Sequence, residues 1–421
     1  MSEPIVIKEY DTPKKAELKG CDLIGLNNYI EKQGLSCALK ITPAGVEATS
    51  YAGVIKYKKL HLQILPKLIG KNDDKQNILQ NLIFMLSYTR KLEIKTTNDA
   101  KLSAAKNPFI EILIREYANS LFGCLKRLTP KNYVCEEDNL PYLKGKIKFA
   151  ENIRLNACNQ AKFYCQYDEF SENNALNQLF LFVSECLYNI SGDSHNRKIL
   201  KFIINYYSDV ELVRFDKFKA AKIMLSRNQQ LFKKPFGLAK MFVEKTSVDL
   251  TKNRFESITL LWDMNKLFEE FVFEIMKEMQ EELQCRISAQ KHAKLLKEKQ
   301  NDGNFCKKRD TFVDIMAEKD DGKKIILDTK YKEFHGFDDA ANSDIFQVSA
   351  YCLLHNATHA VLIYPRYDEK DPSLSEYFLN TDENAPKIKI SFKTINLKYQ
   401  NLKTSLPQIK EDIKGIFFLN E

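Results

Sequence analysis

The sequence predicts an α/β chain, α+β overall, and the pattern of its C-terminal part is the main reason. Residues 260–283 place apolar side chains along one face of a long amphipathic helix. Three short segments with the composition of strands follow, at 285–289, 311–317 and 323–332. A second helical pattern at 344–354 leads into the apolar strand 359–365. This order of helix, strands, helix and strand indicates a mixed sheet flanked by helices.

The length of 421 residues exceeds one ordinary hydrophobic core, so two or three domains are expected. We predict an N-terminal mixed β/α domain over residues 1–150, a mainly helical middle region over 151–255, and a C-terminal domain with the mixed sheet over 256–421. In the first of these, apolar and polar residues alternate over 60–65. This alternation predicts a half-buried strand.

The composition argues against several classes of protein. No apolar run reaches the roughly 18–20 residues that cross a bilayer, and the first ten residues lack the basic start and apolar segment of a secretory signal. We therefore expect a cytoplasmic protein that does not enter a membrane. The ten cysteines are scattered without a Cys-x-x-Cys pair, which argues against a zinc site and for reduced, buried thiols. The net charge of +8 permits a nucleic-acid partner without requiring one.

The stretch "IILDTK", residues 325–330, is the first candidate for chemistry. A D-x-K pattern alone is weak evidence, because it recurs at four polar places in this lysine-rich chain. Here an apolar strand leads into it, and residues two apart on a strand share a face, so Asp328 and Lys330 point the same way. Asp314 lies on the preceding strand, and Asp321-Gly322 predicts a hairpin turn between the two.

Such a hairpin brings Asp314 beside Asp328. Two adjacent carboxylates repel each other unless a proton or a cation lies between them, and hard oxygen ligands favour Mg²⁺, with Mn²⁺ as a possible substitute. We therefore predict both aspartates as metal ligands. Lys330 is predicted to orient or help deprotonate a water and to offset charge on a phosphorane-like transition state. A solvated hairpin with charged tips is the alternative interpretation.

Three more polar side chains can reach the neighbourhood of Asp314 and Asp328. Gln347 and Tyr351 are four residues apart on the next predicted helix and therefore share a face, from which they can approach DNA or a metal-bound water. Glu269 lies at the rim of the apolar stripe on the helix 260–283 and is a candidate third acid. For all three, an ordinary surface position is the alternative.

The lysine-rich stretch 286–309 is expected to be a connection between strands that contacts phosphates, since such contacts supply most of the nonspecific affinity for DNA. The candidate DNA-binding residues in it are Lys291, Lys294, Lys307, Lys308 and Arg309. A flexible solvated loop without a ligand is the alternative.

Together, Asp314, Asp328-x-Lys330 and Gln347-x-x-x-Tyr351 resemble the core of the PD-(D/E)xK nucleases, in the branch with a trailing QxxxY helix. Over about residues 50–365 the chain also resembles the McrC family, the nuclease subunits of McrBC-type modification-dependent restriction systems. The segments that carry this likeness, in the family's order, are "GVIKYKKLHLQILPKL", "LKGKIKF", "DEFSENNALNQLFLF", "MNKLFEEFV" and "LDTKYK".

The resemblance implies catalytic roles for Asp314, Asp328 and Lys330, and it implies supporting roles for the three further candidates of the two helices. One departure from the family's pattern is Val313, because a proline usually precedes the first aspartate. Asp310 is an alternative first acid, although the apolar neighbours of Asp314 favour that residue. Lys332 is the second choice for the lysine.

The resemblance also implies the activity and the partners. It implies a C-terminal PD-(D/E)xK restriction-endonuclease-like domain that cuts double-stranded DNA containing a modified base such as 5-methylcytosine, with Mg²⁺. It further implies docking of the N-terminal region, roughly residues 1–150, on a hexameric McrB-like AAA+ GTPase whose GTP hydrolysis the chain stimulates. This chain has no G-x-x-x-x-G-K-[ST] loop, so we expect it to bind no nucleotide. A non-catalytic activator of such a ring and a stand-alone repair or recombination nuclease are the alternatives.

Overall fold

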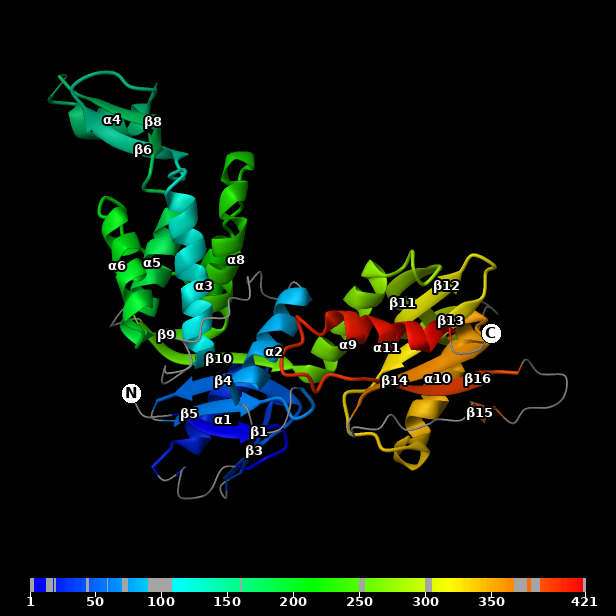
Figure 1. Ribbon diagram of the computed structural model, residues 1–421. Coiled ribbons are helices and arrows are strands. Elements are labelled where there is room, and N and C mark those ends of the chain that lie inside the picture. Colours follow the sequence, from blue (N-terminus) through cyan, green and yellow to red (C-terminus); the bar gives the residue numbers. More distant parts are fainter. Residues whose placement is uncertain are drawn as a thin grey trace. The chain divides into compact units, whose positions relative to one another are not determined.

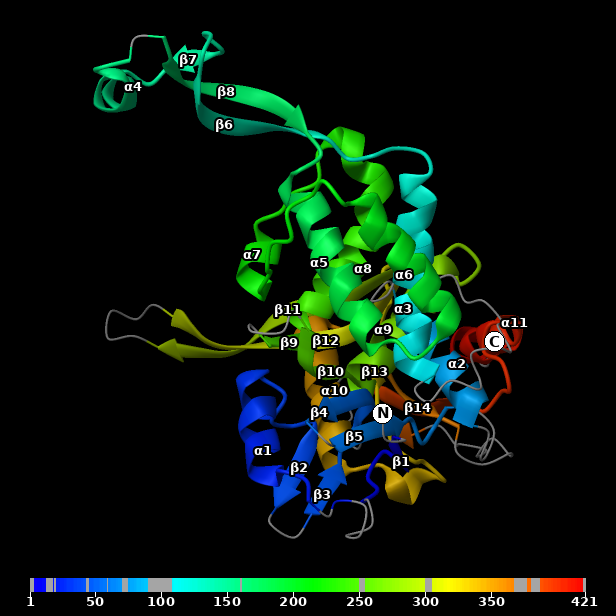
Figure 2. The same cartoon turned by 90° about the vertical axis from the view of Figure 1, so that its left-hand side faces the viewer.

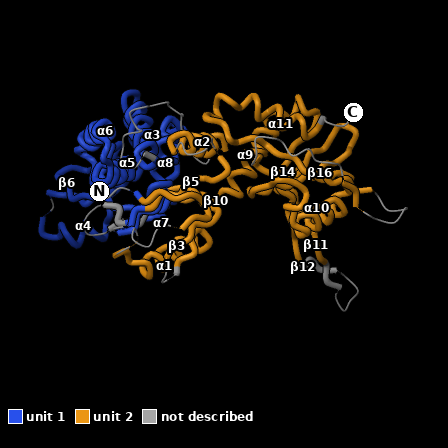
Figure 3. The backbone as a smooth tube through the Cα atoms, turned by 60° about the horizontal axis from the view of Figure 1, so that its bottom comes forward, with its two compact units in different colours: residues 1–4, 54–61, 99–260 blue, residues 5–53, 62–98, 261–421 orange. Residues whose placement is uncertain are grey.

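The structure is a computed structural model that describes residues 4–12, 18, 20–42, 45–58, 60–69, 75–89, 108–159, 161–249, 254–299, 305–366, 377–379 and 387–418. The chain divides into two compact units, each assembled from segments that are not consecutive in the sequence (Figure 3). Unit 1 consists of Met1–Pro4, Val54–His61 and Asp99–Leu260. Unit 2 consists of Ile5–Gly53, Leu62–Asn98 and Leu261–Glu421.

Unit 1 is mainly helical. Its helices are α3 (Pro108–Leu125), α5 (Ala175–Ile190), α6 (Ser194–Tyr206), α7 (Lys217–Ala221), the 3-10 helix η2 (Arg227–Phe232) and α8 (Lys233–Glu244). Helices α3 and α5 each pack against both α6 and α8 (Figure 1). Tyr117 lies fully buried in this bundle, and its hydroxyl donates to the carbonyl oxygen of Phe180 over 3.0 Å. The large aromatic core is therefore buried without leaving this hydroxyl unpaired.

An antiparallel arm extends from the helices of unit 1 (Figure 2). It consists of β6 (Asn132–Leu140), β7 (Lys146–Ile147), α4 (Phe149–Asn156) and β8 (Phe163–Ser171), with the strand order β6-β8-β7. Gly145 precedes β7 with φ +70°, and a Cβ added there would lie 2.3 Å from the carbonyl oxygen of Gln166. The close approach of β7 to β8 therefore requires glycine at this position.

The N-terminal part of the chain contributes mostly short strands. Its elements are β1 (Ile5–Lys8), α1 (Leu23–Lys32), β2 (Leu39–Thr42), β3 (Gly45–Ala48), β4 (Tyr51–Tyr57), β5 (Leu60–Leu65) and α2 (Lys75–Tyr88). A five-stranded sheet has the order β1-β5-β4-β10-β9, with β9 at Thr246–Asp249 and β10 at Arg254–Asp263. The prediction of a half-buried strand over 60–65 is wrong: all six residues of β5 are buried, including His61 and Gln63. An inner strand covered on both faces has no solvent side, so its polar residues lie inside.

The C-terminal part of unit 2 contains a six-stranded mixed sheet with the order β11-β12-β13-β14-β16-β15. The strands are β11 (Cys285–Lys299), β12 (Phe305–Lys319), β13 (Lys324–Thr329), β14 (His359–Pro365), β15 (Tyr377–Phe378) and β16 (Lys389–Ile395). Strands β11 to β13 are antiparallel, whereas β13, β14 and β16 are parallel. Helices α9 (Met264–Glu278), α10 (Asn342–His355) and α11 (Leu406–Phe418) pack against this sheet. The predicted α/β class with a mixed sheet is confirmed.

Two details of this part differ from the prediction. The amphipathic helix begins at Met264 instead of residue 260, because 260–263 end strand β10 and Asp263 caps the helix through the backbone N–H of Asn265. The lysine-rich stretch is mostly strand instead of a connection, since β11 pairs with β12 out to Lys299 and Phe305. The Asp321-Gly322 turn is confirmed, with Gly322 at φ +80°. No helix in the described part of the chain is long and apolar enough to span a membrane.

Candidate active site

The two predicted aspartates lie where the β12–β13 ladder ends. The last pair is Ile315 with Leu327, and the next position in register sets Asp314 opposite Asp328. Asp314 Oδ2 accepts a hydrogen bond from the backbone N–H of Thr329 over 3.1 Å. Asp328 is fully buried, and its Oδ1 atom has no hydrogen-bond partner among the described residues. The predicted hairpin therefore places both carboxylates at one end of the sheet.

Lys330 lies directly after β13 and faces the same place. Its Nζ atom is 2.6 Å from Asp328 Oδ2, with the lysine side chain 21% exposed and the aspartate 0% exposed. The same amino group donates to Gln347 Oε1 over 3.1 Å. Lys330 thus connects a buried carboxylate with helix α10 and still reaches the surface.

Helix α10 supplies three side chains to this network. Gln347 Nε2 donates to the Tyr351 hydroxyl over 2.8 Å, as their spacing of four residues predicted. Tyr351 is only 6% exposed, so it supports Gln347 from within the core instead of presenting itself to solvent. Asp344 accepts a hydrogen bond from Lys332 Nζ over 2.8 Å. Lys332, the second-choice lysine, is therefore bound to helix α10 and not to the paired aspartates.

Glu269 enters the site from helix α9. Its Oε1 atom accepts a hydrogen bond from Gln290 Nε2 of strand β11 over 2.5 Å. Burial raises the pKa of Glu269 to about 7, with a further contribution from the negative charge of Asp314 and a smaller one from Asp328. Because both aspartates act on its pKa, Glu269 is a candidate third acid of the site.

The aspartates themselves hold protons more tightly than usual. The pKa of Asp328 is raised to about 7, first by burial and then by the neighbouring Asp314, against the opposing effect of Lys330. Burial also raises the pKa of Asp314, although the hydrogen bonds from Thr329 oppose this. For Lys330, burial lowers the pKa, but the negative charges of Asp328, Asp344 and Asp314 together outweigh burial and the net pKa is raised. Burial, and for Asp328 also the neighbouring Asp314, therefore disfavours the ionised form of these carboxyls.

A divalent cation fits part of this site. The buried, unpartnered Oδ1 of Asp328 beside a second carboxylate is the oxygen environment that Mg²⁺ or Mn²⁺ takes. Among the described residues, no three His, Cys, Asp or Glu side chains stand close enough together to hold a metal as they are. Mg²⁺ is commonly held by two carboxylates, and water or substrate oxygens then fill its remaining coordination positions.

The predicted DNA-binding residues lie on the β11–β12 ribbon. Lys291, Lys294 and Arg309 are exposed there. The side chains of Lys307 and Lys308 lie outside the described residues. The alternative first acid, Asp310, lies four residues along β12 from Asp314, about 13 Å away, and its Oδ1 is 2.8 Å from His292 Nε2. It is therefore not a member of the aspartate pair.

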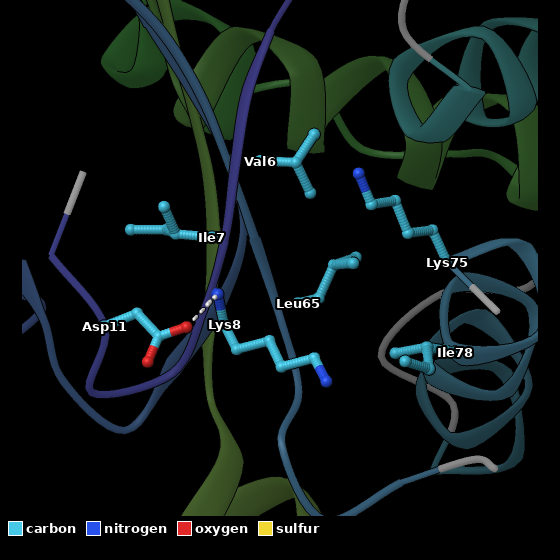
Figure 4. Close-up of a pocket in the computed structure, with 7 residues that line it drawn as sticks. All are labelled: Val6, Ile7, Lys8, Asp11, Leu65, Lys75 and Ile78. Atoms are coloured by element: carbon cyan, nitrogen blue, oxygen red, sulfur yellow. Dashed lines mark hydrogen bonds between the residues drawn. The ribbon is translucent and has the colours of Figure 1, made fainter. Parts of the chain in front are cut away.

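A cavity of about 290 Å³ lies elsewhere in unit 2, among β1, β5 and α2 (Figure 4). Its lining consists of Val6, Ile7, Lys8, Asp11, Leu65, Lys75 and Ile78. None of the predicted site residues lines it. The carboxylates instead lie where the β12–β13 ladder of the C-terminal sheet ends.

The sequence did not identify Gln290, Asp344 or Thr329 as parts of the site. The sequence contains a signal for Asp344: it is three residues before Gln347 on the same helix, so the two side chains share a face. Thr329 acts through its backbone N–H, which any residue supplies. Gln290 has no sequence signal, because its role depends on a local backbone conformation.

The comparisons with known proteins concern the family and the fold of the chain. The model of the family described as "McrBC 5-methylcytosine restriction system component" matches residues 46–365, which is more than half of the chain. A search of curated proteins found no match.

Two solved structures share the fold. A chain in the refined half-complex from a tetradecameric assembly of Thermococcus gammatolerans McrB AAA+ hexamers with bound McrC is 19% identical, with a TM-score of 0.74 over 98% of this chain and 100% of that chain. A chain in the cryo-EM structure of the Thermococcus gammatolerans McrBC complex is 22% identical, with a TM-score of 0.52 over 65% of this chain and 87% of that chain. By the extent of the family match, this chain belongs to the family of McrBC 5-methylcytosine restriction system components.

Proposed function

We propose that this chain is the nuclease subunit of a GTP-dependent, modification-dependent restriction system and that it hydrolyses DNA phosphodiesters. The observation that carries the proposal is the pairing of half-buried Asp314 with fully buried Asp328, with Lys330 Nζ 2.6 Å from Asp328. Burying one acid beside a second acid and a lysine is costly for stability, and such arrangements are concentrated at functional sites.

Asp314 and Asp328 would hold a Mg²⁺ ion, and Mn²⁺ suits the same oxygen ligands. A bound divalent ion supplies Lewis-acid polarisation of the phosphate and lowers the pKa of a coordinated water. The raised pKa of Asp328, caused by burial and by Asp314, supports a cation here, because added positive charge favours the ionised carboxylate.

The other residues have roles that follow from their contacts. Lys330 keeps a positive charge beside Asp328, where it offsets the negative charge that develops on the phosphorus oxygens during attack by water. Gln347, supported by Tyr351, accepts a second hydrogen bond from the Lys330 amino group and helps to hold it in place. Glu269, with a pKa raised to about 7 chiefly by burial, can accept or return a proton near neutral pH.

The β11–β12 ribbon would bind the DNA backbone. Lys291, Lys294 and Arg309 are exposed on strands that lead directly to the aspartates. Phosphate contacts from such side chains position a duplex without reading its sequence. Recognition of the modified base therefore belongs to another part of the assembly.

That assembly would include a hexameric AAA+ GTPase like McrB, on which this chain docks and whose GTP hydrolysis it stimulates. The proposal rests on the family match and on the shared fold with a chain from an assembly of McrB AAA+ hexamers with bound McrC. Docking through the N-terminal region, residues 1–150, and a cytoplasmic location are parts of the same proposal.

The test is cleavage of a cytosine-methylated plasmid by the full chain with its AAA+ partner, GTP and Mg²⁺. We expect Asp328→Ala and Lys330→Ala each to lower the rate of cutting by about 100-fold or more. The matched controls are Asp321→Ala and Lys323→Ala, because these residues form another D-x-K ion pair, 2.8 Å apart and exposed, at the turn of the same hairpin. The controls should cut at the parent rate.

Two outcomes are decisive. Cutting at the parent rate by Asp328→Ala and Lys330→Ala would contradict the catalytic assignment. Loss of cutting with retained stimulation of the partner's GTPase would show that the chain has two separable activities.

A further inference from the structure

Glu269 is held in place from strand β11. It lies on helix α9, which packs against both β11 and β13, and the negative charges of Asp314 and Asp328 both act on its carboxylate. Repulsion by two neighbouring acids favours rotation of a glutamate away from them. The hydrogen bond from Gln290 Nε2 to Glu269 Oε1, 2.5 Å long, opposes that rotation. Gln290 is thus placed to determine where the third acid points.

The backbone at Gln290 is unusual for a strand. Its φ is +50°, in the left-handed region that residues other than glycine, asparagine and aspartate rarely adopt. The residues on either side pair regularly with β12, Ala289 with Ile315 and Lys291 with Val313. The register sets Gln290 opposite Asp314, yet this one pair is missing from the ladder.

This local break has a consequence for the site. In a regular antiparallel ladder, directly opposite residues project from the same face at a fixed spacing. A left-handed residue departs from that geometry, and here its side chain reaches helix α9. Strained conformations of this kind persist only where the surroundings impose them, and they are concentrated at active sites.

We propose that Gln290 is a positioning residue for the nuclease reaction, which uses a left-handed backbone to fix Glu269 against Asp314 and Asp328. The inference rests on the proposed function and adds to it a residue that does not touch the substrate. Gln290 acts through Glu269, so its effect depends on the presence of the Glu269 carboxylate.

The test uses Gln290→Gly, which removes the side chain and leaves a residue that adopts φ +50° without strain. Gln284→Gly is the matched control. Gln284 has the same residue type and nearly the same φ, +51°, and is exposed just before β11 begins. Both variants lose one strained glutamine, and only one of them loses a contact with the site.

We expect Gln290→Gly to cut methylated plasmid about 10- to 100-fold more slowly than the parent, with GTP, Mg²⁺ and the AAA+ partner present, as removal of outer partners of an active site does. Its urea midpoint, measured without metal, should be no lower than that of the parent. Gln284→Gly should cut at the parent rate. Slow cutting by a fully stable variant is not the result of a general structural defect.

A double-mutant cycle then tests whether Gln290 acts through Glu269. Gln290→Gly, Glu269→Gln and the combined variant are compared with the parent in urea unfolding and, where cutting is measurable, in rate. We expect the effect of Gln290→Gly on the free energy of unfolding and on the rate of cutting to change when Glu269→Gln is present. Identical effects in both backgrounds, or parent-rate cutting by Gln290→Gly, would overturn the inference. Parent-rate cutting by Asp328→Ala would instead overturn the proposed function.

Discussion

Glu9 is a buried acid that should make the free energy of unfolding of this protein depend on pH. It lies just after β1 and is 1% exposed. Its Oε2 atom accepts hydrogen bonds from the backbone N–H of Lys67, over 2.8 Å, and from the Tyr331 hydroxyl, over 3.1 Å. Burial raises the pKa of Glu9 from 4.5 to about 8 despite these two bonds. At neutral pH, Glu9 is therefore protonated in the folded state.

The sign of the pH dependence follows from the difference between the pKa of Glu9 in the folded protein and in the unfolded chain. Between pH 4.5 and 8, folded Glu9 holds a proton that the unfolded chain has lost, so rising pH favours unfolding. The slope is about 1.4 kcal/mol for each pH unit, which gives about 5 kcal/mol over the whole window. Below pH 4.5 both states are protonated, and the stability that the proton confers is fully present. Between pH 5.5 and 7.5 the loss is about 3 kcal/mol.

Glu9→Gln isolates this contribution. A glutamine keeps an oxygen that accepts from Lys67 and Tyr331, and it does not titrate. The free energy of unfolding of the variant, relative to the parent, should therefore rise by about 3 kcal/mol between pH 5.5 and 7.5. Trp262, the only tryptophan, lies in unit 2 with Glu9, so its fluorescence in urea reports the unfolding of the relevant unit.

The control is Glu281→Gln, an exposed glutamate of the same unit. Its curve of stability against pH should run parallel to that of the parent. If the curve of Glu9→Gln also runs parallel to the parent between pH 5.5 and 7.5, Glu9 carries its charge in the folded protein and the burial argument is refuted.

Three further changes have definite expected outcomes. Tyr351→Phe removes the hydroxyl that accepts from Gln347, and the loss of about 1 kcal/mol should lower single-turnover cutting about 5-fold. Arg115→Met breaks the buried ion pair with Asp193, 3.2 Å long, and should cost about 3 kcal/mol of stability in urea unfolding followed by circular dichroism. Gly145→Ala requires the backbone beside β8 to move, so limited trypsin digestion should cut the arm of unit 1 faster than in the parent.

The hairpin with Asp314 and Asp328 was predictable because its signals are local. Apolar runs on both sides and the Asp321-Gly322 turn specify two adjacent strands, and their pairing then determines which residues meet. The pairing of Gln347 with Tyr351 followed in the same way from the helical repeat. Where chemistry depends on residues at a fixed spacing in one element, a single sequence is sufficient.

The extent of the β11–β12 ribbon was not predictable for the opposite reason. Lys291 and Lys294 are exposed, so the strand has no buried face there and no alternation of apolar and polar residues. The same composition is typical of a loop. The start of helix α9 at Met264 was missed because residues 260–262 are apolar and extend the helical pattern backwards, although Asp263 is a good capping residue.

Three residues of the proposed site share a feature: Asp314, Lys330 and Gln290 each lie where the pairing of strands is incomplete. Asp314 has no partner in register on either β11 or β13. Lys330 is the first residue after β13, and Gln290 occupies the missing pair of β11. A fully paired strand fixes its side chains on its two faces at regular spacing, which leaves little room for three acids to converge. Breaks in the ladder allow convergence, and the paired strands on either side hold the converging groups in place.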